Sequence, residues 1–168
     1  MTSHQEKKSL KSNDLEAAKY DALKLLSYRG RTRSELSKRL ALKGYDDGTV
    51  EKTLAHLETI GLVDDLKWAH DRINYYLRKG YGIIGIKNVL REKGVDRQLA
   101  ETALESISLE TETEAGSLFL GKKYKPPFDI KTKKRVLDAL RRRGFSNEAI
   151  NCVLKNVQEE RNENNDEE

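Results

Sequence analysis

The sequence predicts an all-α protein of three tandem three-helix, helix-turn-helix-like repeats that together form an elongated curved array. The first observation is a constant spacing of 50 residues between Gly44, Gly94 and Gly144, each with a leucine four positions before it. The second is that Pro126 and Pro127 are the only prolines, so little else in the chain forbids helix. The third is composition, because 36% charged and 36% hydrophobic residues fit several small cores better than one large core.

Each of the three glycines predicts a sharp corner between two helices. A glycine just past a helix end adopts the left-handed conformation that closes the helix. The hydrophobic residue after it is expected to pack on the preceding leucine and on the fourth position of the next helix. The three sets, each in the order hydrophobic residue, leucine and fourth position, are Tyr45, Leu40 and Val50; Val95, Leu90 and Ala100; and Phe145, Leu140 and Ile150.

Local signals at the helix ends justify the elements in order. Gly61 ends a helix, and Asp64 or Asp65 begins the next one. Capping boxes are expected at Asn13 with Glu16, Thr32 with Glu35, and Thr111 with Glu114. Together with the corners, these signals predict helices at 14–28, 32–43, 47–60, 65–79, 83–93, 97–108, 112–124, 131–143 and 147–160.

The three repeats are expected at 12–61, 62–109 and 110–158, after a disordered N-terminus over residues 1–12. Residues 158–168 carry six acids against Arg161, which predicts an acidic disordered tail over 159–168. The net charge of +4 for the whole chain therefore rises to +9 without residues 158–168. Such a surplus is typical of a protein that contacts nucleic acid or an acidic protein surface.

Composition also excludes several classes of protein. No run of 18 apolar residues exists, so neither a membrane span nor a signal peptide is expected, and the prediction is a soluble, cytoplasmic monomer. The single Cys152 excludes an internal disulfide and a cysteine-based zinc site. His4, His56 and His70 are scattered, so neither a metal nor any other cofactor is expected.

No residue pattern favours an enzyme, and no catalytic residue is expected. Asp64 and Asp65 form a paired carboxylate, but two acids at a helix start ordinarily cap the helix and favour its dipole. His70 has an acidic neighbour and no third partner for a nucleophilic triad. The Gly-x-Gly-x-x-Gly string from Gly80 to Gly85 does not follow a strand, which favours a turn between helices over a dinucleotide site.

Four aromatic residues in the middle of the chain allow two interpretations. Exposed rings would form a base-stacking platform for nucleic acid. The rings are Trp68, Tyr75, Tyr76 and Tyr81. Helical spacing favours a core stripe instead, and that stripe would comprise Trp68, Ala69, Ile73, Tyr76 and Leu77.

The strongest charge cluster lies at residues 121–144, where ten lysines and arginines face only Asp129 and Asp138. At 100° per residue, five of these cations lie opposite the apolar face of the helix at 131–143. The equivalent surfaces of the other two repeats are nearly neutral. We interpret the cluster as a contact surface for phosphates or acidic side chains, with a solvated charge run as the alternative. The candidate contact residues are Lys131, Lys134, Arg135, Arg141 and Arg142, with Lys122, Lys123, Lys79 and Arg91.

Residues 64–95 combine an Asp-Asp start, an aromatic–Ala pair at 68–69, a Lys-Gly-Tyr-Gly turn at 79–82 and a Leu-x-x-Lys-Gly ending at Gly94. In this combination the segment resembles the central signature of the RecX family of recombination regulators. The resemblance extends from about residue 16 to 157. Tyr76, Ile83 and Gly85 depart from it, because family members commonly have Arg, Pro and Arg there.

The resemblance implies a non-enzymatic regulator of three three-helix repeats that lies in the groove of the RecA–DNA filament and inhibits its activity. The implied partners are the RecA filament and single- and double-stranded DNA. The implied setting is homologous recombination, DNA repair and the SOS response.

Two other interpretations stay open. Residues 33–63 are compatible with a winged-helix transcription regulator, although that fold needs a β-hairpin wing after Gly61. A generic helical-repeat scaffold with another partner is the third interpretation.

Overall fold

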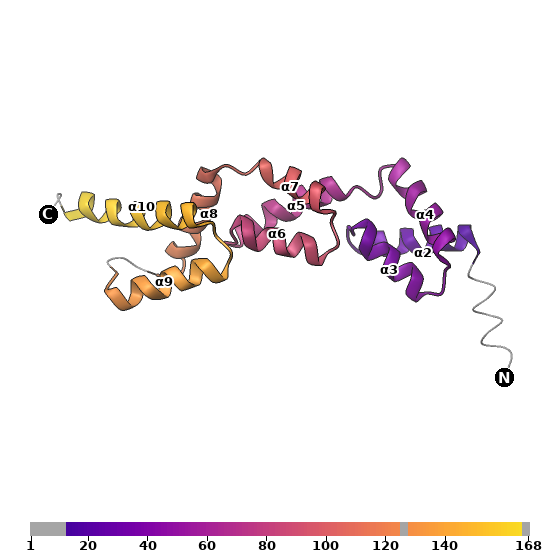
Figure 1. Ribbon diagram of the computed structural model, residues 1–168. Coiled ribbons are helices and arrows are strands. Elements are labelled where there is room, and N and C mark those ends of the chain that lie inside the picture. The colour runs from indigo at the N-terminus through magenta and orange to yellow at the C-terminus, as the bar shows by residue number, and fades with distance from the viewer. Residues whose placement is uncertain (1–12, 125–127, 166–168) are drawn as a thin grey trace, which may run out of the picture. The chain divides into compact units, whose positions relative to one another are not determined.

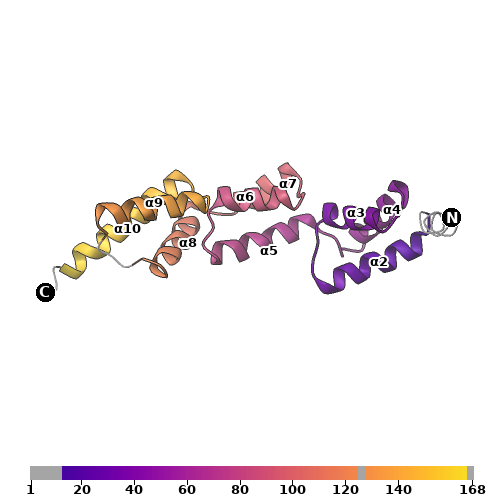
Figure 2. The ribbon, with the colours of Figure 1, turned by 90° about the horizontal axis from the view of Figure 1, so that it is seen from below.

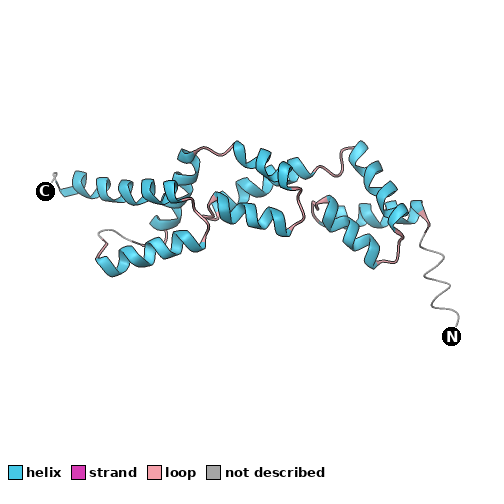
Figure 3. Cartoon of the chain, in the orientation of Figure 1, coloured by secondary structure: helices cyan, strands magenta, loops and turns pink. Residues whose placement is uncertain are grey.

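The computed structural model describes residues 13–124 and 128–165, which form nine α-helices and no strand (Figures 1 and 3). The helices are α2 (Leu15–Tyr28), α3 (Arg33–Leu42), α4 (Asp47–Thr59), α5 (Asp65–Arg78), α6 (Ile83–Glu92), α7 (Arg97–Glu105), α8 (Leu109–Gly121), α9 (Ile130–Arg142) and α10 (Asn147–Asn165). The all-α prediction is confirmed. The segment 1–12, expected to be disordered, lies outside the described residues. None of the described helices combines the length and the apolar character that crossing a membrane requires.

The predicted start of α8 is wrong by three residues, and the predicted cap of α2 is wrong by one. Ser108, and not Thr111, caps α8, because the Ser108 hydroxyl accepts a hydrogen bond from the Thr111 backbone N–H at 3.1 Å. The helix therefore begins three residues earlier than expected. Asp14, and not Asn13, caps α2. In both cases a neighbouring residue with an equally good capping side chain takes the position.

The C-terminal helix is longer than expected. α10 continues to Asn165, so residues 159–165, which were expected to be a disordered tail, are helical. No glycine or proline interrupts this stretch, and glutamate, glutamine and arginine are good helix formers. High charge alone therefore does not end this helix. Residues 166–168 of the predicted tail lie outside the described residues.

The chain divides into two compact units. Unit 1 comprises residues 1–69 and 92–99, and unit 2 comprises residues 70–91 and 100–168. In unit 1, α2, α3 and α4 pack as a three-helix bundle (Figures 1 and 2). In unit 2, α8 packs along α10, and α9 contacts α10. The core of unit 1 comprises Ala18, Ala22, Leu36, Leu40, Tyr45, Val50, Leu54, Leu57 and Val63. The predicted repeat boundaries at 61/62 and 109/110 stay a prediction.

The three corner glycines have the predicted backbone. Gly44, Gly94 and Gly144 have φ of 96°, 73° and 71°, in the left-handed region. At the first corner the Tyr45 N–H donates to the Leu40 carbonyl at 3.3 Å, and the third corner has the equivalent bond at 3.2 Å. Each of the nine residues predicted to pack at the corners is at most 6% exposed. The left-handed glycine predicted at each corner is therefore confirmed, and the first and third corners also have the closing hydrogen bond.

Unit 1 contains contacts between the start of α3 and two distant segments. The Asp65 carboxylate accepts a hydrogen bond from the Arg33 N–H, the first residue of α3, at 2.8 Å. Burial raises the pKa of Asp65, and the bond from Arg33 opposes this rise only in part. The Thr32 hydroxyl donates to the Lys93 carbonyl at 2.7 Å. We call these contacts the unit 1 seam.

Unit 2 contains similar contacts, which we call the unit 2 seam. Glu112 accepts a hydrogen bond from the Ile83 N–H, the first residue of α6, at 2.9 Å. The Gly82 N–H donates to the Arg143 carbonyl at 3.0 Å. Ile83, Gly82 and Arg143 lie 50 positions after Arg33, Thr32 and Lys93 of the unit 1 seam. Two features differ, because Glu112 lies 47 positions after Asp65, and Gly82 donates through its backbone where Thr32 donates through its hydroxyl.

The glycine string from Gly80 to Gly85 belongs to the unit 2 seam. A Cβ on Gly82 would lie 2.2 Å from the Phe145 Cα, and one on Gly85 would lie 2.4 Å from the Arg143 carbonyl oxygen. Gly82 and Gly85 let two backbones approach closely. Gly80 and Gly82 lie between α5 and α6, where a turn was predicted, whereas Gly85 lies in the first turn of α6. The segment after Gly61 leads into α5, so the β-hairpin that a winged-helix module requires is not found there.

Truncation of a corner leucine should strongly destabilise unit 2. Leu140 is fully buried beside Phe145 at the third corner, so Leu140→Ala should lower the free energy of unfolding by about 2–5 kcal/mol. Leu118→Ala is the matched control, because Leu118 is 63% exposed on α8 and its removal should cost about 0.5 kcal/mol or less. Urea denaturation followed by circular dichroism measures both, and equal midpoints would contradict the predicted packing.

Candidate nucleic-acid interface

The candidate interface is built on α9, an amphipathic helix of unit 2. Its start is fixed by Asp129, whose carboxylate accepts a hydrogen bond from the Thr132 N–H at 2.6 Å. The hydrogen bonds from Thr132, followed by the charge of Arg135, hold the pKa of Asp129 below its usual value. Val136 and Leu140 are fully buried and fix the inner face of the helix. Burial of this face leaves the opposite side of α9 to the solvent.

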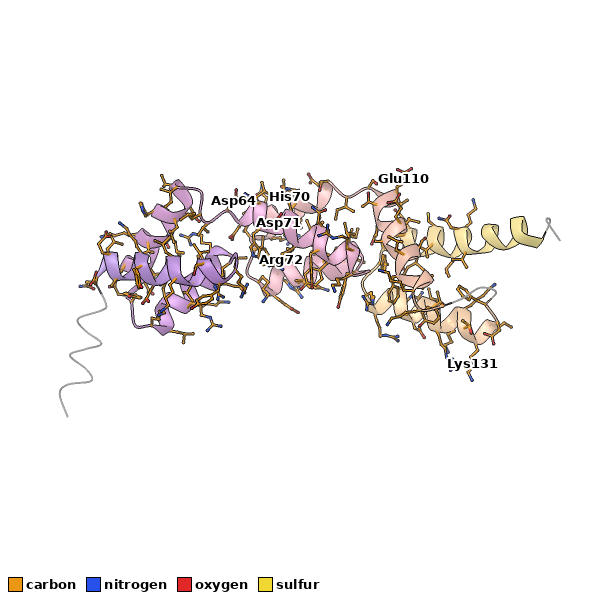
Figure 4. All side chains as sticks on the ribbon, turned by 180° about the vertical axis from the view of Figure 1, so that it is seen from behind. Asp64, His70, Asp71, Arg72, Glu110 and Lys131 are labelled. Carbon is orange, nitrogen blue, oxygen red and sulfur yellow. The ribbon has the colours of Figure 1, made fainter. Side chains whose placement is uncertain are left out.

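Five cations predicted on that opposite side are exposed, as expected: Lys131, Lys134, Arg135, Arg141 and Arg142. Figure 4 shows Lys131 pointing away from the helices of unit 2. Among the described residues, no salt bridge or hydrogen bond joins any of these five side chains to an acid. Asp138, on the same side of the helix, is half-buried. We call the five cations the α9 face.

The other four candidates lie at the C-terminal ends of helices. Lys122 and Lys123 follow α8, Lys79 follows α5, and Arg91 lies in the last turn of α6; all four are exposed. Cations at these ends interact favourably with the helix dipole, so their position has a local explanation as well.

Arg143 brings two of these four candidates together at the end of α9. Its guanidinium donates to the Lys79 carbonyl at 2.6 Å, and it lies 4.4 Å from the centre of the Phe119 ring. The Lys123 ammonium lies 5.5 Å from the centre of the same ring. Among the described residues, no such contact joins Arg91 to α9. Lys79 and the Phe119 ring beside Lys123 thus contact Arg143 at the end of α9, and Arg91 does not.

The aromatic stripe of α5 is mainly core, as preferred above. Trp68 is 8% exposed, and its indole N–H donates to the Gly30 carbonyl at 3.4 Å. Ile73 and Leu77 are buried and Tyr76 is half-buried. Tyr75, which the helical spacing left outside the stripe, is 41% exposed.

Sequence analysis missed two residues of this region, Glu112 and Arg143. Glu112 is 2% exposed and accepts hydrogen bonds from the Ser146 N–H at 2.9 Å and the Ser146 hydroxyl at 2.6 Å, besides the bond from Ile83. No local pattern distinguishes it from an exposed helical glutamate. Arg143 had a signal in the sequence, because Lys93, 50 positions earlier, also directly precedes a corner glycine. No cluster of three metal-ligating side chains occurs in the described ranges.

Comparison with known proteins identifies similar sequences over most of the chain. The model of the first three-helix domain of RecX matches residues 18–57. Regulatory protein RecX of Mycobacterium sp. (strain JLS) is 34% identical over 142 residues, which cover 80% of this chain and 78% of that protein. Regulatory protein RecX of Halorhodospira halophila (strain DSM 244 / SL1) is 29% identical over 147 residues, covering 86% and 91%.

Two crystal structures have a similar fold. RecX from Lactobacillus salivarius superposes with a TM-score of 0.78 at 23% identity, covering 86% of this chain and 97% of that chain. A second structure, of regulatory protein RecX, superposes with a TM-score of 0.73 at 25% identity, covering 84% and 73%. At 23% identity, the first of these two structures shows a shared fold alone. Similarity of sequence is shown by the two relatives described above.

Proposed function

Because the chain belongs to the RecX family of regulatory proteins, we propose that it binds the RecA–DNA filament, inhibits it, and contacts nucleic-acid phosphates through the α9 face. The predicted position in the filament groove is part of this proposal. The protein would act in recombination and DNA repair as a regulator without turnover of its own. RecA and DNA are then its partners.

The observation that carries the proposal is that, among the described residues, none of the five cations of the α9 face forms a salt bridge. A cation already paired with a carboxylate gains little from a phosphate, because the first partner must be displaced. The five cations of the α9 face have no such partner among the described residues, so a phosphate would replace only water and small ions. Release of counterions from the nucleic acid then favours binding.

The spacing of these cations suits an extended polyanion. Lys131 and Arg142 are 11 residues apart on one helix, which corresponds to about 16 Å along its axis. Double-stranded DNA carries one negative charge per roughly 1.7 Å of its axis, so several phosphates lie within that length. The face therefore fits a run of phosphates better than a single small anion.

The RecA part of the proposal is tested by titrating the protein into RecA on single-stranded DNA. ATP hydrolysis by RecA should fall at ratios well below one protein per RecA, because a groove-bound regulator affects a cooperative polymer from few sites. Unchanged ATP hydrolysis and strand exchange across a wide titration would contradict it and favour the scaffold interpretation.

The DNA part is tested by reversing charge on the α9 face. The triple variant Lys134→Glu, Arg135→Glu and Arg142→Glu should weaken DNA binding by orders of magnitude. It should also lower the slope of log affinity against log salt by about 2–3, since each phosphate contact contributes roughly 0.7–0.9. Fluorescence anisotropy of labelled DNA across a salt series measures both quantities.

A matched control separates the α9 face from net charge. Lys24→Glu, Lys52→Glu and Lys67→Glu reverse three exposed lysines of unit 1, so this variant has the same net charge as the α9 variant. The control should retain most of the affinity. If both variants lose DNA binding equally, general electrostatics accounts for binding and the α9 face has no special role. If the α9 variant loses DNA but still inhibits RecA, the RecA contact lies elsewhere.

A further inference from the structure

A chain of aromatic and cationic side chains crosses unit 2 beside the α9 face. The rings of Tyr75 and Tyr76 meet edge to face with centroids 5.2 Å apart, and Tyr76 meets Tyr81 in the same way at 5.3 Å. The Arg143 guanidinium lies 4.8 Å from the centre of the Tyr81 ring and 4.4 Å from that of Phe119. These contacts connect the exposed surface of α5 to the C-terminal end of α9.

Arg143 holds this chain of contacts in place. Its guanidinium donates to the carbonyls of Lys79 at 2.6 Å and Gly80 at 3.2 Å, at the C-terminal end of α5. Arg143 is also the residue that ends α9, and its carbonyl takes part in the unit 2 seam. The aromatic surface on α5 therefore has a fixed position relative to α9.

Tyr75 is the exposed end of the chain of contacts. Its side chain is 41% exposed, whereas Tyr76 and Tyr81 are half-buried and Phe119 is buried. Arg72 and Lys79 flank the ring, with the guanidinium 5.9 Å and the ammonium 5.6 Å from its centre. Both distances are near the outer limit of about 6 Å for a cation–π contact. The Arg72 and Lys79 side chains are flexible, so they do not block the face of the Tyr75 ring.

We propose that Tyr75 is a stacking platform for a base of single-stranded nucleic acid, with Lys79 as the partner for a flanking phosphate. The proposal rests on the proposed function of the α9 face, because one strand would contact both. An exposed aromatic ring with cations beside it provides the two features that single-strand binding uses. These are a π-face for a base and positive charge for the nucleic-acid backbone.

The platform distinguishes single strands from duplexes. Bases in a duplex are stacked on one another, so their faces are not available to Tyr75, whereas the phosphates of both forms are available to the cations. The α9 face should therefore serve both forms of nucleic acid. Tyr75 should add affinity for the single strand alone. The expected preference for single strands arises from the Tyr75 ring, so it can be measured separately from the contribution of the cations to affinity.

The test uses fluorescence anisotropy with a single-stranded oligo-dT of about 20 nucleotides, long enough for the ~4–16 nucleotides of a typical single-strand site. An oligo-rU of the same length shows whether the protein binds single-stranded DNA or single-stranded RNA. A duplex of equal length serves as the probe whose base faces are not available to Tyr75. Tyr75→Leu should weaken binding of the single strand that the parent holds about 5- to 100-fold, the effect of one lost base stack. It should leave duplex affinity and the salt slope unchanged.

Two further variants make the result specific. Tyr75→Phe keeps the ring and should bind like the parent. Tyr28→Leu is the matched control, because Tyr28 is 74% exposed on α2 of unit 1 and has no flanking cation–π contact among the described residues. It should leave all affinities unchanged. Unaltered single-strand affinity in Tyr75→Leu, or an equal loss in Tyr75→Phe, overturns the proposal.

A separate measurement does not depend on how well Tyr75→Leu folds. Tyr75→Trp places an indole at the platform, while the parent's Trp68 is buried and serves as the reference. The single strand should quench the fluorescence of this variant beyond that of the parent, and the duplex should not. Absence of extra quenching overturns the proposal. If the α9 variant loses DNA affinity while the Tyr75 variants bind like the parent, the stacking role of Tyr75 is wrong and the α9 face stands. If Tyr75→Leu loses single-strand affinity while the α9 variant binds like the parent, the role of the α9 face is wrong and that of Tyr75 stands.

Discussion

Gly144→Ala should destabilise unit 2 much more than Gly61→Ala destabilises unit 1, although the two glycines have nearly the same backbone. Their φ values are 71° and 70°, and for each the left-handed conformation penalises a Cβ by about 1–2 kcal/mol. They differ in surroundings. A Cβ on Gly144 would lie 2.1 Å from the backbone nitrogen of Gly85, whereas one on Gly61 would have no atom within 4 Å.

The extra cost at Gly144 arises because the obstructing atoms are backbone. A side chain can turn aside, but Gly85 is fixed by its own hydrogen bond to the Gly144 carbonyl at 3.2 Å. Overpacking of this kind costs about 1–3 kcal/mol, and occasionally more, beyond the conformational penalty. Urea denaturation should therefore shift the midpoint of Gly144→Ala much further than that of Gly61→Ala. Equal shifts would mean that the seam relaxes freely.

Glu112→Ala should destabilise unit 2 by about 1–3 kcal/mol, as expected when buried hydrogen-bond donors lose their acceptor. The Glu112 carboxylate accepts three hydrogen bonds, from the Ile83 N–H, the Ser146 N–H and the Ser146 hydroxyl. Ile83 begins α6, and Ser146 immediately precedes α10, so one side chain serves the starts of two helices. Its loss leaves these donors without a partner in a buried site.

The matched control is Glu114→Ala, two residues further along α8, where the side chain is exposed. That change should alter the free energy of unfolding by about 0.5 kcal/mol or less. The free energy of unfolding of Glu112→Gln should lie between those of the two alanine variants. Its amide keeps one acceptor oxygen but directs an N–H₂ group toward the donors of Ile83 and Ser146. Thermal and urea unfolding measure the series, and a midpoint for Glu112→Ala close to that of Glu114→Ala would refute the role of Glu112.

Features that depend on neighbouring residues were predictable from the sequence. The corners at Gly44, Gly94 and Gly144 combine a backbone requirement with hydrophobic neighbours a few positions away, so the pattern determines them locally. The exposure of the α9 face follows in the same way from helical geometry. The start of α8 was predicted wrongly because Ser108 and Thr111 are both good caps, and only the observed hydrogen bond decides between them.

Features that depend on distant residues were not predictable. Glu112 meets Ile83 and Ser146, which are 29 and 34 positions away, and its sequence neighbourhood is that of an ordinary exposed helix. The outward position of Tyr75, by contrast, was predictable, because helical spacing placed Tyr76 in the core stripe and left Tyr75 outside it.

The two seams have a consequence for how such a chain diversifies. Several of their bonds use backbone atoms, such as the Gly82 N–H with the Arg143 carbonyl, or the Ile83 N–H with a single carboxylate. Backbone groups are present whatever the side chain, so mutation of the outer faces leaves the seams intact. Selection can then rewrite the surface chemistry of one helix without altering the segments that it packs against. The concentration of ten lysines and arginines at residues 121–144 is the outcome that such modular inheritance permits.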